Sequence, residues 1–211
     1  MKIICIARNY TEHAVEMNAP QYERGSVEAQ SPAFFLKPDS ALLQRGMPFF
    51  YPDFSSQVEH EVEVVVRIDK VGKSIDERFA HRYYNSVALG IDFTARDLQR
   101  EAKAKGLPWT LSKGFDGSAV LSDFVPLAEL EHDVQHLAFS LSRNGQVVQQ
   151  GNTADMLCSV DCMISYISQF MLLRTGDLIY TGTPSGVGPV VIGDILEGEL
   201  EGRPLLQCKV K

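Results

Sequence analysis

The segment from His60 to Ile68 constrains the fold most, because apolar residues occupy every second position from Val62 onward. Side chains of a β-strand point alternately to its two faces. The valines and Ile68 would therefore cover one face and supply part of a core. Glu61 and Glu63 would lie side by side on the opposite face. The segment thus predicts a strand with two carboxylates on one face.

Two carboxylates on one strand face are unfavourable without a partner, because each raises the energetic cost of ionising the other. Asp92, at the end of the apolar segment Val87–Asp92, could supply a third carboxylate. Three carboxylates without a cysteine or a spaced histidine nearby form a hard oxygen site, which suits Mg²⁺, Mn²⁺ or Ca²⁺ better than zinc. The alternative interpretation of Glu61 and Glu63 is an ordinary solvated strand face.

The composition is typical of a globular protein. The chain has 211 residues, 45% hydrophobic and 22% charged, which predicts a single domain over residues 1–211 with a substantial core. A net charge of −7 without a basic run argues against nucleic acid or an anionic membrane as partner. The apolar start Met1–Ala7 is too short for a signal sequence, and no stretch reaches the length of a membrane span. We therefore expect a cytoplasmic protein.

The cysteines show neither zinc spacing nor a dense disulfide framework, so free thiols are expected at Cys5, Cys158, Cys162 and Cys208. Cys158 and Cys162 are four residues apart and would share a buried helix face. Core packing is their expected role.

Short strands outnumber helices in the predicted element order. Strands are expected over residues 2–6, 33–38, 60–68, 87–92, 139–141, 147–148, 178–180, 195–197 and 205–210. The dipeptide Asn144-Gly145 predicts a hairpin between two of them. Because the helices are scattered rather than alternating with strands, we expect an α+β fold. It would be a mixed, mostly antiparallel β roll or barrel with peripheral helices.

Helices are expected over residues 11–17, from the capping box Ser74–Glu77 to about Tyr84, from Thr94 to Gly106, and over residues 160–172. The polar, poorly patterned segment after the first of these predicts a mobile loop. Long loops in compact domains are usually functional or disordered.

Several polar residues are candidates for chemistry. Glu16 lies one helical turn after His13 and could hold that imidazole basic, although such a pair is also common on surfaces. Arg96 and Gln99 would face the same side of a helix that follows Asp92; a solvated helix face is the alternative.

Two further candidates come from glycine-bearing segments. Lys113 precedes Gly114, and a lone lysine in a loop that contains glycine is usually a surface residue. The segment Tyr180–Pro189 could be a plain turn-rich connection. Its glycines would also let backbone N–H groups approach an anionic ligand, with Thr183 adding a hydroxyl. It lacks the lysine pattern of a nucleotide P-loop.

Together these motifs resemble the fumarylacetoacetate hydrolase family, in its short single-domain branch of acylpyruvases and oxaloacetate decarboxylases or tautomerases. The resemblance covers nearly the whole chain. It rests on six motifs, namely Arg8-Asn9-Tyr10 with His13 and Glu16, Phe35–Pro38, His60–Glu63, Asp92–Gln99, Gly106–Lys113 and Thr181–Gly188.

The resemblance implies a homodimer of a β-rich fold peculiar to this family, with Mg²⁺ or Mn²⁺ held by Glu61, Glu63 and Asp92. It also implies a catalytic group comprising His13, Glu16 and Lys113, and substrate contacts from Arg8, Arg96, Gln99 and Thr183. Residues 11–30 would form a lid over the site. The extra material Gln21–Ser26 in that lid leaves substrate size and closure open.

The expected activity is metal-dependent hydrolysis of a C–C bond in a small β-diketo acid. His13, oriented by Glu16, would take a proton from water, and Lys113 and Gln99 would stabilise the developing oxyanion. The first alternative is an oxaloacetate decarboxylase or tautomerase, or an isomerase or hydratase of aromatic-catabolic keto acids. The second is a non-catalytic metal- or metabolite-binding protein, which is weakened because a binder does not need the base.

Overall fold

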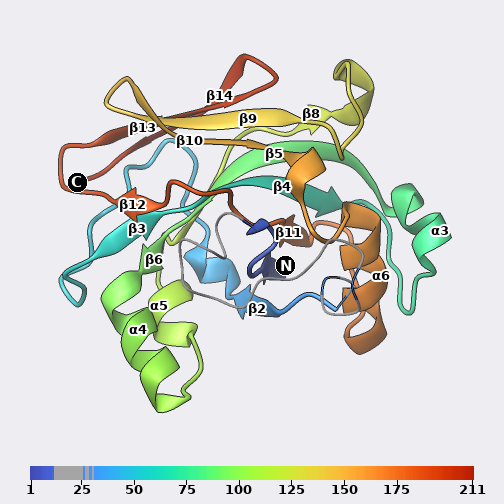
Figure 1. The fold of residues 1–211 in the computed structure, drawn as a ribbon, viewed down its shortest axis with the longest axis horizontal. Helices are drawn as coiled ribbons and strands as arrows, with labels where there is room; N and C mark the ends of the chain where they lie inside the picture. Colours follow the sequence, from blue (N-terminus) through green and yellow to red (C-terminus); the bar gives the residue numbers. More distant parts are fainter. Residues whose placement is uncertain (12–25, 27–28, 30) are drawn as a thin grey trace.

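The computed structural model describes residues 1–11, 26, 29 and 31–211 (Figure 1). The predicted helix over residues 11–17 and the lid therefore lie almost entirely outside the described residues. Both stay predictions. No helix among the described residues is long and apolar enough to cross a membrane.

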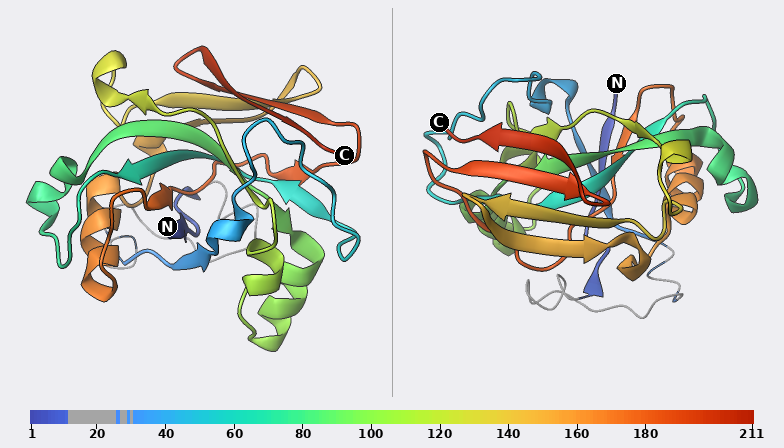
Figure 2. Two further views of the ribbon diagram at one scale, coloured as in Figure 1. Left: turned by 180° about the vertical axis from the view of Figure 1, so that it is seen from behind. Right: turned by 90° about the horizontal axis from the view of Figure 1, so that it is seen from above.

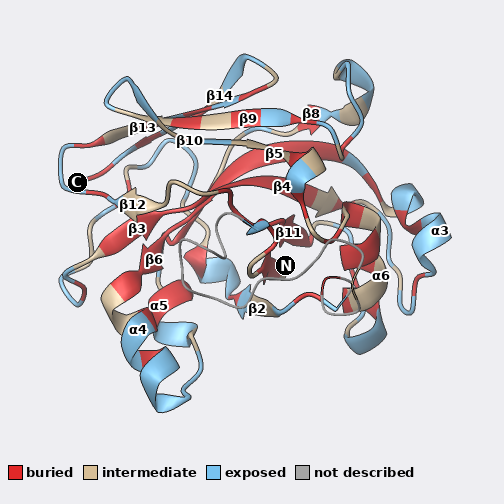
Figure 3. Ribbon diagram, in the orientation of Figure 1, coloured by how far each residue is buried: buried red, intermediate tan, exposed pale blue. Residues whose placement is uncertain are grey.

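A seven-stranded sheet forms the centre of the molecule, in the order β2-β1-β11-β4-β5-β7, with β8 also paired to β5. Its strands are β1 (Ile3–Ile6), β2 (Phe34–Lys37), β4 (Val62–Ile68), β5 (Tyr84–Asp92), β7 (Ala119–Leu121), β8 (Val125–Pro126) and β11 (Leu178–Tyr180). The pair β1–β11 is parallel, whereas the other pairs of this sheet are antiparallel. Figure 3 shows β4 and β5 buried along most of their length.

A four-stranded antiparallel sheet, β10-β9-β13-β14, lies across one face of the central sheet (Figures 1 and 2). Its strands are β9 (Ala138–Arg143), β10 (Gln146–Asn152), β13 (Ile195–Leu200) and β14 (Arg203–Lys209). The two sheets are in close contact, because a Cβ added at Gly198 would lie 3.1 Å from a methyl carbon of Leu89. A third sheet joins β3 (Val58–His60), β6 (Thr94–Ala95) and β12 (Gly188–Pro189). The result is the mixed, mostly antiparallel α+β fold that the sequence predicts.

The helices lie at the edges of this β structure (Figure 1). Over residues 31–211 they are α3 (Glu77–Ala80), α4 (Arg96–Lys105), α5 (Thr110–Lys113) and α6 (Val160–Phe170). Four short 3₁₀ turns of the same range lie at Asp39–Ala41, His81–Tyr83, Leu127–Glu129 and Thr153–Asp155. The predicted stop of α4 is confirmed, because Gly106 ends it in the left-handed conformation at φ 65°. Ser159 caps α6 by accepting a hydrogen bond from the Cys162 backbone N–H.

Two helix predictions were wrong at their starts. Ser74 does not cap a helix, since its φ is 50° and the cap is Asp76, which accepts from the Arg78 N–H. The α-helix that follows ends at Ala80 and continues only as a 3₁₀ turn. The helix expected from Thr94 begins at Arg96 instead, because residues 94 and 95 pair with β3.

The strand predicted over residues 60–68 is interrupted at Glu61. Up to His60 the chain pairs with β6 and β12, and from Val62 it pairs with β5 and β11. A change of partners requires a local departure from regular strand geometry. The predicted Asn144-Gly145 hairpin is confirmed, with both residues at positive φ between β9 and β10.

All four cysteines are buried free thiols. Cys158 and Cys162 do not share a helix face as predicted, because Cys158 precedes the Ser159 cap and lies outside α6.

Candidate functional site

Three carboxylates converge inside the protein. Ligand atoms of Glu61, Glu63 and Asp92 all lie within 4.8 Å of one another, and each of the three residues is at most 5% exposed. Burial contradicts the alternative of a solvated strand face.

The strand arrangement brings these side chains together. Glu61 occupies the break between β3 and β4, Glu63 is the second residue of β4, and Asp92 ends β5. The two chain segments are joined at this point, because the Asp92 backbone N–H donates to the Glu61 carbonyl at 2.8 Å. Asp92 therefore faces Glu61 from the neighbouring strand.

The glycine-bearing segment after β11 contacts this cluster through its backbone. The Gly182 N–H donates to Oε2 of Glu63 at 2.6 Å. Gly182 has φ 97°, and an added Cβ would lie 2.8 Å from Cβ of Asn9, so only glycine fits there. A backbone N–H of this segment thus binds a carboxylate of the protein itself, and the approach of these N–H groups to an anionic ligand stays a prediction.

Lys113 bridges two of the three carboxylates. Its Nζ donates to Oε2 of Glu61 at 2.6 Å and to Oδ2 of Asp92 at 2.7 Å. Burial of the ammonium favours the neutral amine, but the charges of Asp92 and Glu61 outweigh burial and raise the pKa of Lys113. The lysine is therefore a buried cation rather than the surface residue that its sequence context also allowed.

Lys37 is a second buried cation that sequence reasoning did not include among the site residues. Its Nζ lies 2.7 Å from Oδ1 of Asp92 and donates to the hydroxyl and carbonyl oxygens of Ser118 at 2.9 and 3.1 Å. A signal was present, because a lysine ends the otherwise apolar segment Phe34–Leu36. Lysine is rarely buried without a charged partner.

Arg96 and Gln99 lie on one face of α4 and turn toward the cluster, so the solvated-face alternative is wrong for them. The Arg96 guanidinium donates to Glu61 and to Gln99, each at 2.6 Å. It also donates to Glu59 at 2.6 Å, a residue that the sequence analysis did not single out. Burial disfavours the guanidinium charge, but Glu61 and Glu59 outweigh this effect and raise the pKa of Arg96.

Among the described ion pairs of the site, the buried carboxyl groups outnumber the buried cations bound to them. The buried carboxyl groups are Glu59, Glu61, Glu63 and Asp92, and the buried cations bound to them are Lys37, Arg96 and Lys113. With all groups ionised, one negative charge would remain. Burial, together with the charges of Asp92 and Glu61, raises the pKa of Glu63 well above its usual value. This excess of buried oxygen ligands is what a divalent cation would offset.

Thr183 and Arg8 lie in the same region. The Thr183 hydroxyl donates to the Val62 carbonyl at 2.8 Å, which places it beside the residue between the two glutamates. Burial lowers the pKa of Lys103 on α4, and the charges of Arg96, Lys113 and Arg8 add to that effect. Arg8 therefore belongs to the same electrostatic neighbourhood. Substrate contacts from both residues remain predictions.

His13 and Glu16 lie outside the described residues. Their role as a catalytic dyad stays a prediction from the sequence.

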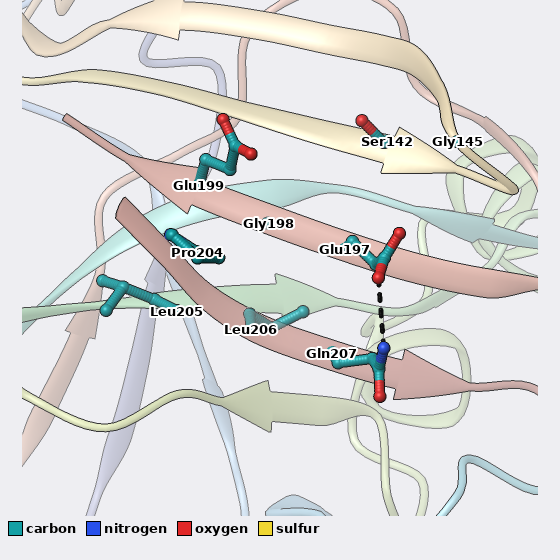
Figure 4. Close-up of a pocket in the computed structure, with 9 residues that line it drawn as sticks. All are labelled: Ser142, Gly145, Glu197, Gly198, Glu199, Pro204, Leu205, Leu206 and Gln207. Carbon is teal, nitrogen blue, oxygen red and sulfur yellow. Dashed lines mark hydrogen bonds between the residues drawn. The ribbon is translucent and has the colours of Figure 1, made fainter. Parts of the chain in front are cut away.

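A surface hollow is formed by residues outside the carboxylate cluster. About 450 Å³ in volume, it is lined by β9, β13, β14 and the hairpin turn, including Glu197, which accepts from Gln207 at 3.1 Å (Figure 4). None of the carboxylates, lysines or arginines of the buried cluster lines it.

Comparison with known proteins agrees with this geometry. The family described as fumarylacetoacetate (FAA) hydrolase C-terminal matches residues 2–211. The chain is 41% identical to the mitochondrial oxaloacetate tautomerase of Mus musculus, over 99% of this chain and 91% of that one. It is 43% identical to the mitochondrial oxaloacetate decarboxylase of Dictyostelium discoideum, over 95% and 89%.

A solved structure shares the fold over the whole chain. The fumarylpyruvate hydrolase of Pseudomonas aeruginosa, in complex with Mn²⁺ and pyruvate, superposes with a TM-score of 0.90 at 34% identity. The match covers 100% of this chain and 89% of that one. On these grounds, the chain belongs to the fumarylacetoacetate hydrolase family.

Proposed function

We propose that this protein is a divalent-metal-dependent enzyme that tautomerises or decarboxylates oxaloacetate or a closely similar keto dicarboxylic acid. The observation that carries the proposal is the buried cluster of Glu61, Glu63 and Asp92 with Lys113 against it. Two relatives that match almost the whole chain are named for oxaloacetate reactions, which favours this reaction over hydrolysis of a β-diketo acid.

The residues fit a divalent metal ion. Three carboxylates supply hard oxygen ligands for Mg²⁺ or Mn²⁺, with Ca²⁺ also compatible, and leave coordination positions for a keto acid. Glu61, Glu63 and Asp92 would hold the ion. When bound, it would polarise the keto oxygen and stabilise negative charge on an enolate.

Lys113 would act on the same enolate as a hydrogen-bond donor. Its carboxylate partners raise its pKa, so the side chain keeps its proton at neutral pH. A well-placed cationic donor is worth several kcal/mol to a developing oxyanion, of the order of 2–4 kcal/mol. Lys113 would therefore orient substrate and stabilise charge rather than serve as the base.

Arg96 would orient the side-chain amide of Gln99. Because its guanidinium donates to the Gln99 oxygen, the NH₂ group of Gln99 is the part of that amide left to face a ligand. Gln99 would thus donate to a substrate carboxylate or carbonyl. Thr183, whose hydroxyl donates to the Val62 carbonyl, would contribute a further substrate contact.

The second candidate is hydrolysis of a C–C bond in an acylpyruvate. The structural similarity to a fumarylpyruvate hydrolase favours it. His13, oriented by Glu16, would then take a proton from water, and the resulting hydroxide would attack the distal carbonyl. Cleavage would leave an enolate of the same kind.

A substrate panel tests the proposal. Enol-to-keto conversion of oxaloacetate, its decarboxylation, and hydrolysis of acylpyruvates are each measured with Mg²⁺, with Mn²⁺ and with EDTA. We expect metal-dependent turnover of oxaloacetate that is lost in Glu63→Gln. Full turnover in EDTA would contradict the proposal. A higher kcat/KM for an acylpyruvate would favour the second candidate.

The homodimer and the cytoplasmic location remain proposals that rest on the family resemblance and on the sequence. Sedimentation equilibrium of the purified chain checks the first of these.

A further inference from the structure

Gln149 on β10 is a buried side chain that uses both ends of its amide, although it carries no charge and lies outside the carboxylate cluster. It is 2% exposed. Its Oε1 lies 3.0 Å from the Val62 backbone N and 2.9 Å from Nδ1 of His60. Its Nε2 lies 2.8 Å from the Thr183 hydroxyl and 3.1 Å from the Pro184 carbonyl. One amide thus connects the β3–β4 segment to the loop that follows β11.

The direction of each hydrogen bond is determined by its partner. The Val62 N–H can only donate and the Pro184 carbonyl can only accept, so the Gln149 oxygen must face Val62. The Thr183 hydroxyl donates to the Val62 carbonyl, which leaves its lone pairs to accept from the Gln149 NH₂ group. His60 must then carry its proton on Nδ1. A different donor arrangement would leave a buried polar group without a partner, which costs about 1–3 kcal/mol.

The hydrogen bonds of Gln149 and Thr183 meet at Val62, beside the break between β3 and β4. Val62 is the residue between Glu61 and Glu63, and it is where β4 begins after the chain changes strand partners. The Gln149 oxygen accepts the N–H at this break, and Thr183 binds the carbonyl of the same residue. Both polar groups of the Val62 backbone are therefore fixed by side chains from outside the strand.

A β-bulge directs Gln149 to this position. The register of the β9–β10 pair shifts between Val147 and Gln149, so Val148 is the extra residue. The loop after β11 closes on the bulge, since a Cβ added at Gly186 would clash with the Val148 carbonyl oxygen. Gly186 has φ 94°, which favours glycine for a second reason.

We propose that Gln149 is a positioning residue for the metal and substrate site. Through Val62 it fixes Glu61 relative to Glu63, and through Thr183 it fixes a substrate contact relative to both. This inference rests on the proposed metal-dependent function. A keto acid chelated at open metal positions needs ligands and contacts in one arrangement, and loss of an outer partner of a metal ligand typically weakens metal affinity 10–100-fold.

The test compares Gln149→Met with Gln150→Met in the full chain. Methionine keeps the volume of glutamine but removes all four hydrogen bonds, and Gln150 is the exposed neighbour on the same strand. The dissociation constant of Mn²⁺ is measured by electron paramagnetic resonance without substrate, and that of oxalate is then measured on the Mn²⁺-loaded protein. Thermal unfolding is recorded for every variant.

We expect Gln149→Met to weaken Mn²⁺ binding about 10–100-fold and oxalate binding further, with Gln150→Met unchanged. A lower melting temperature with an unchanged Mn²⁺ dissociation constant would show a purely structural role and overturn the inference. If the methionine variant does not fold, Gln149→Asn keeps an amide whose shorter reach cannot span both sides. Wild-type Mn²⁺ and oxalate affinity in Gln149→Asn would also overturn the inference.

Glu63→Gln separates this inference from the proposed function. If Glu63→Gln binds Mn²⁺ as tightly as the wild type, the proposed metal site is wrong. If Glu63→Gln loses Mn²⁺ and Gln149→Met does not, the metal site holds and the positioning role of Gln149 is refuted.

Discussion

Glu63→Gln should stabilise the metal-free protein while it removes a metal ligand. The side chain is 2% exposed, and its ligand atom lies within 4.8 Å of those of Glu61 and Asp92. At that distance and an effective dielectric constant of about 20, two negative charges repel by about 3.5 kcal/mol. The Gly182 N–H and Lys113 offset part of this repulsion, so the net gain from removing the charge should be about 1–3 kcal/mol. A glutamine oxygen can still accept from Gly182.

The sign follows from the pKa of Glu63. Burial and the neighbouring carboxylates raise this pKa in the folded protein, so the folded state binds the proton more tightly than the unfolded state does. Stability of the wild type should therefore fall as pH rises from the ordinary carboxyl range toward the raised folded value. Glu63→Gln has no carboxyl group to titrate here and does not lose this stability as pH rises. Its gain in stability over the wild type should therefore be large at pH 8 and smaller in acid.

Thermal unfolding in EDTA at several pH values measures the effect. For a domain of this size the expected gain corresponds to a melting temperature about 3–10 °C higher at pH 8. Glu199→Gln, at an exposed carboxylate on β13, is the matched control and should change little. Added Mn²⁺ should stabilise the wild type more than Glu63→Gln. A melting temperature at or below the wild-type value in EDTA at pH 8 would refute the reasoning.

Three further predictions concern the catalytic residues and the lid. Lys113→Met should bind Mn²⁺ about tenfold more tightly in calorimetry, because the ammonium no longer competes with the metal for Glu61 and Asp92. Its kcat should fall by about 10²–10³. Weaker Mn²⁺ binding by the variant would contradict this competition. His13→Ala should reduce kcat/KM for acylpyruvate hydrolysis by about 10²–10⁴ and kcat/KM for oxaloacetate decarboxylation distinctly less. Unchanged hydrolysis would show that His13 is not the general base. Amide hydrogen exchange in residues 11–30 should slow when oxalate binds, and equal rates with and without oxalate would argue against a lid.

Local patterns were enough to predict much of the fold. The period-two pattern of β4, the Asn144-Gly145 hairpin and the glycine stop of α4 each depend on residues a few positions apart. Errors arose where a long-range contact overrode a local preference. The helix start at Thr94 failed because residues 94 and 95 pair with β3, from a distant part of the chain.

The three carboxylates were predictable because two lie in one strand motif and the third ends an apolar strand. Lys37 and Glu59 were not identified as site residues, and the local sequence held a signal only for Lys37, which ends the apolar segment Phe34–Leu36. Lys37 becomes part of the site because β2 brings its ammonium to within 2.7 Å of Asp92, and Glu59 because Arg96 reaches it from α4. Such partners follow from tertiary structure, and a single sequence contains little signal for them.

The break at Glu61 shows why a regular strand is insufficient for this site. In an unbroken strand, alternate residues are about 6.6 Å apart along one pleated face, and their side chains run parallel. Here the chain leaves one sheet at His60 and joins another at Val62, so Glu61 belongs to neither strand, and its carbonyl accepts from the Asp92 backbone N–H at 2.8 Å. At this irregularity the Val62 backbone is paired by side chains, because Gln149 accepts from its N–H and Thr183 donates to its carbonyl. The geometry of the site therefore depends on a residue of a different sheet, and substitution of Gln149 in β10 should affect metal binding even though no residue of β10 belongs to the carboxylate cluster.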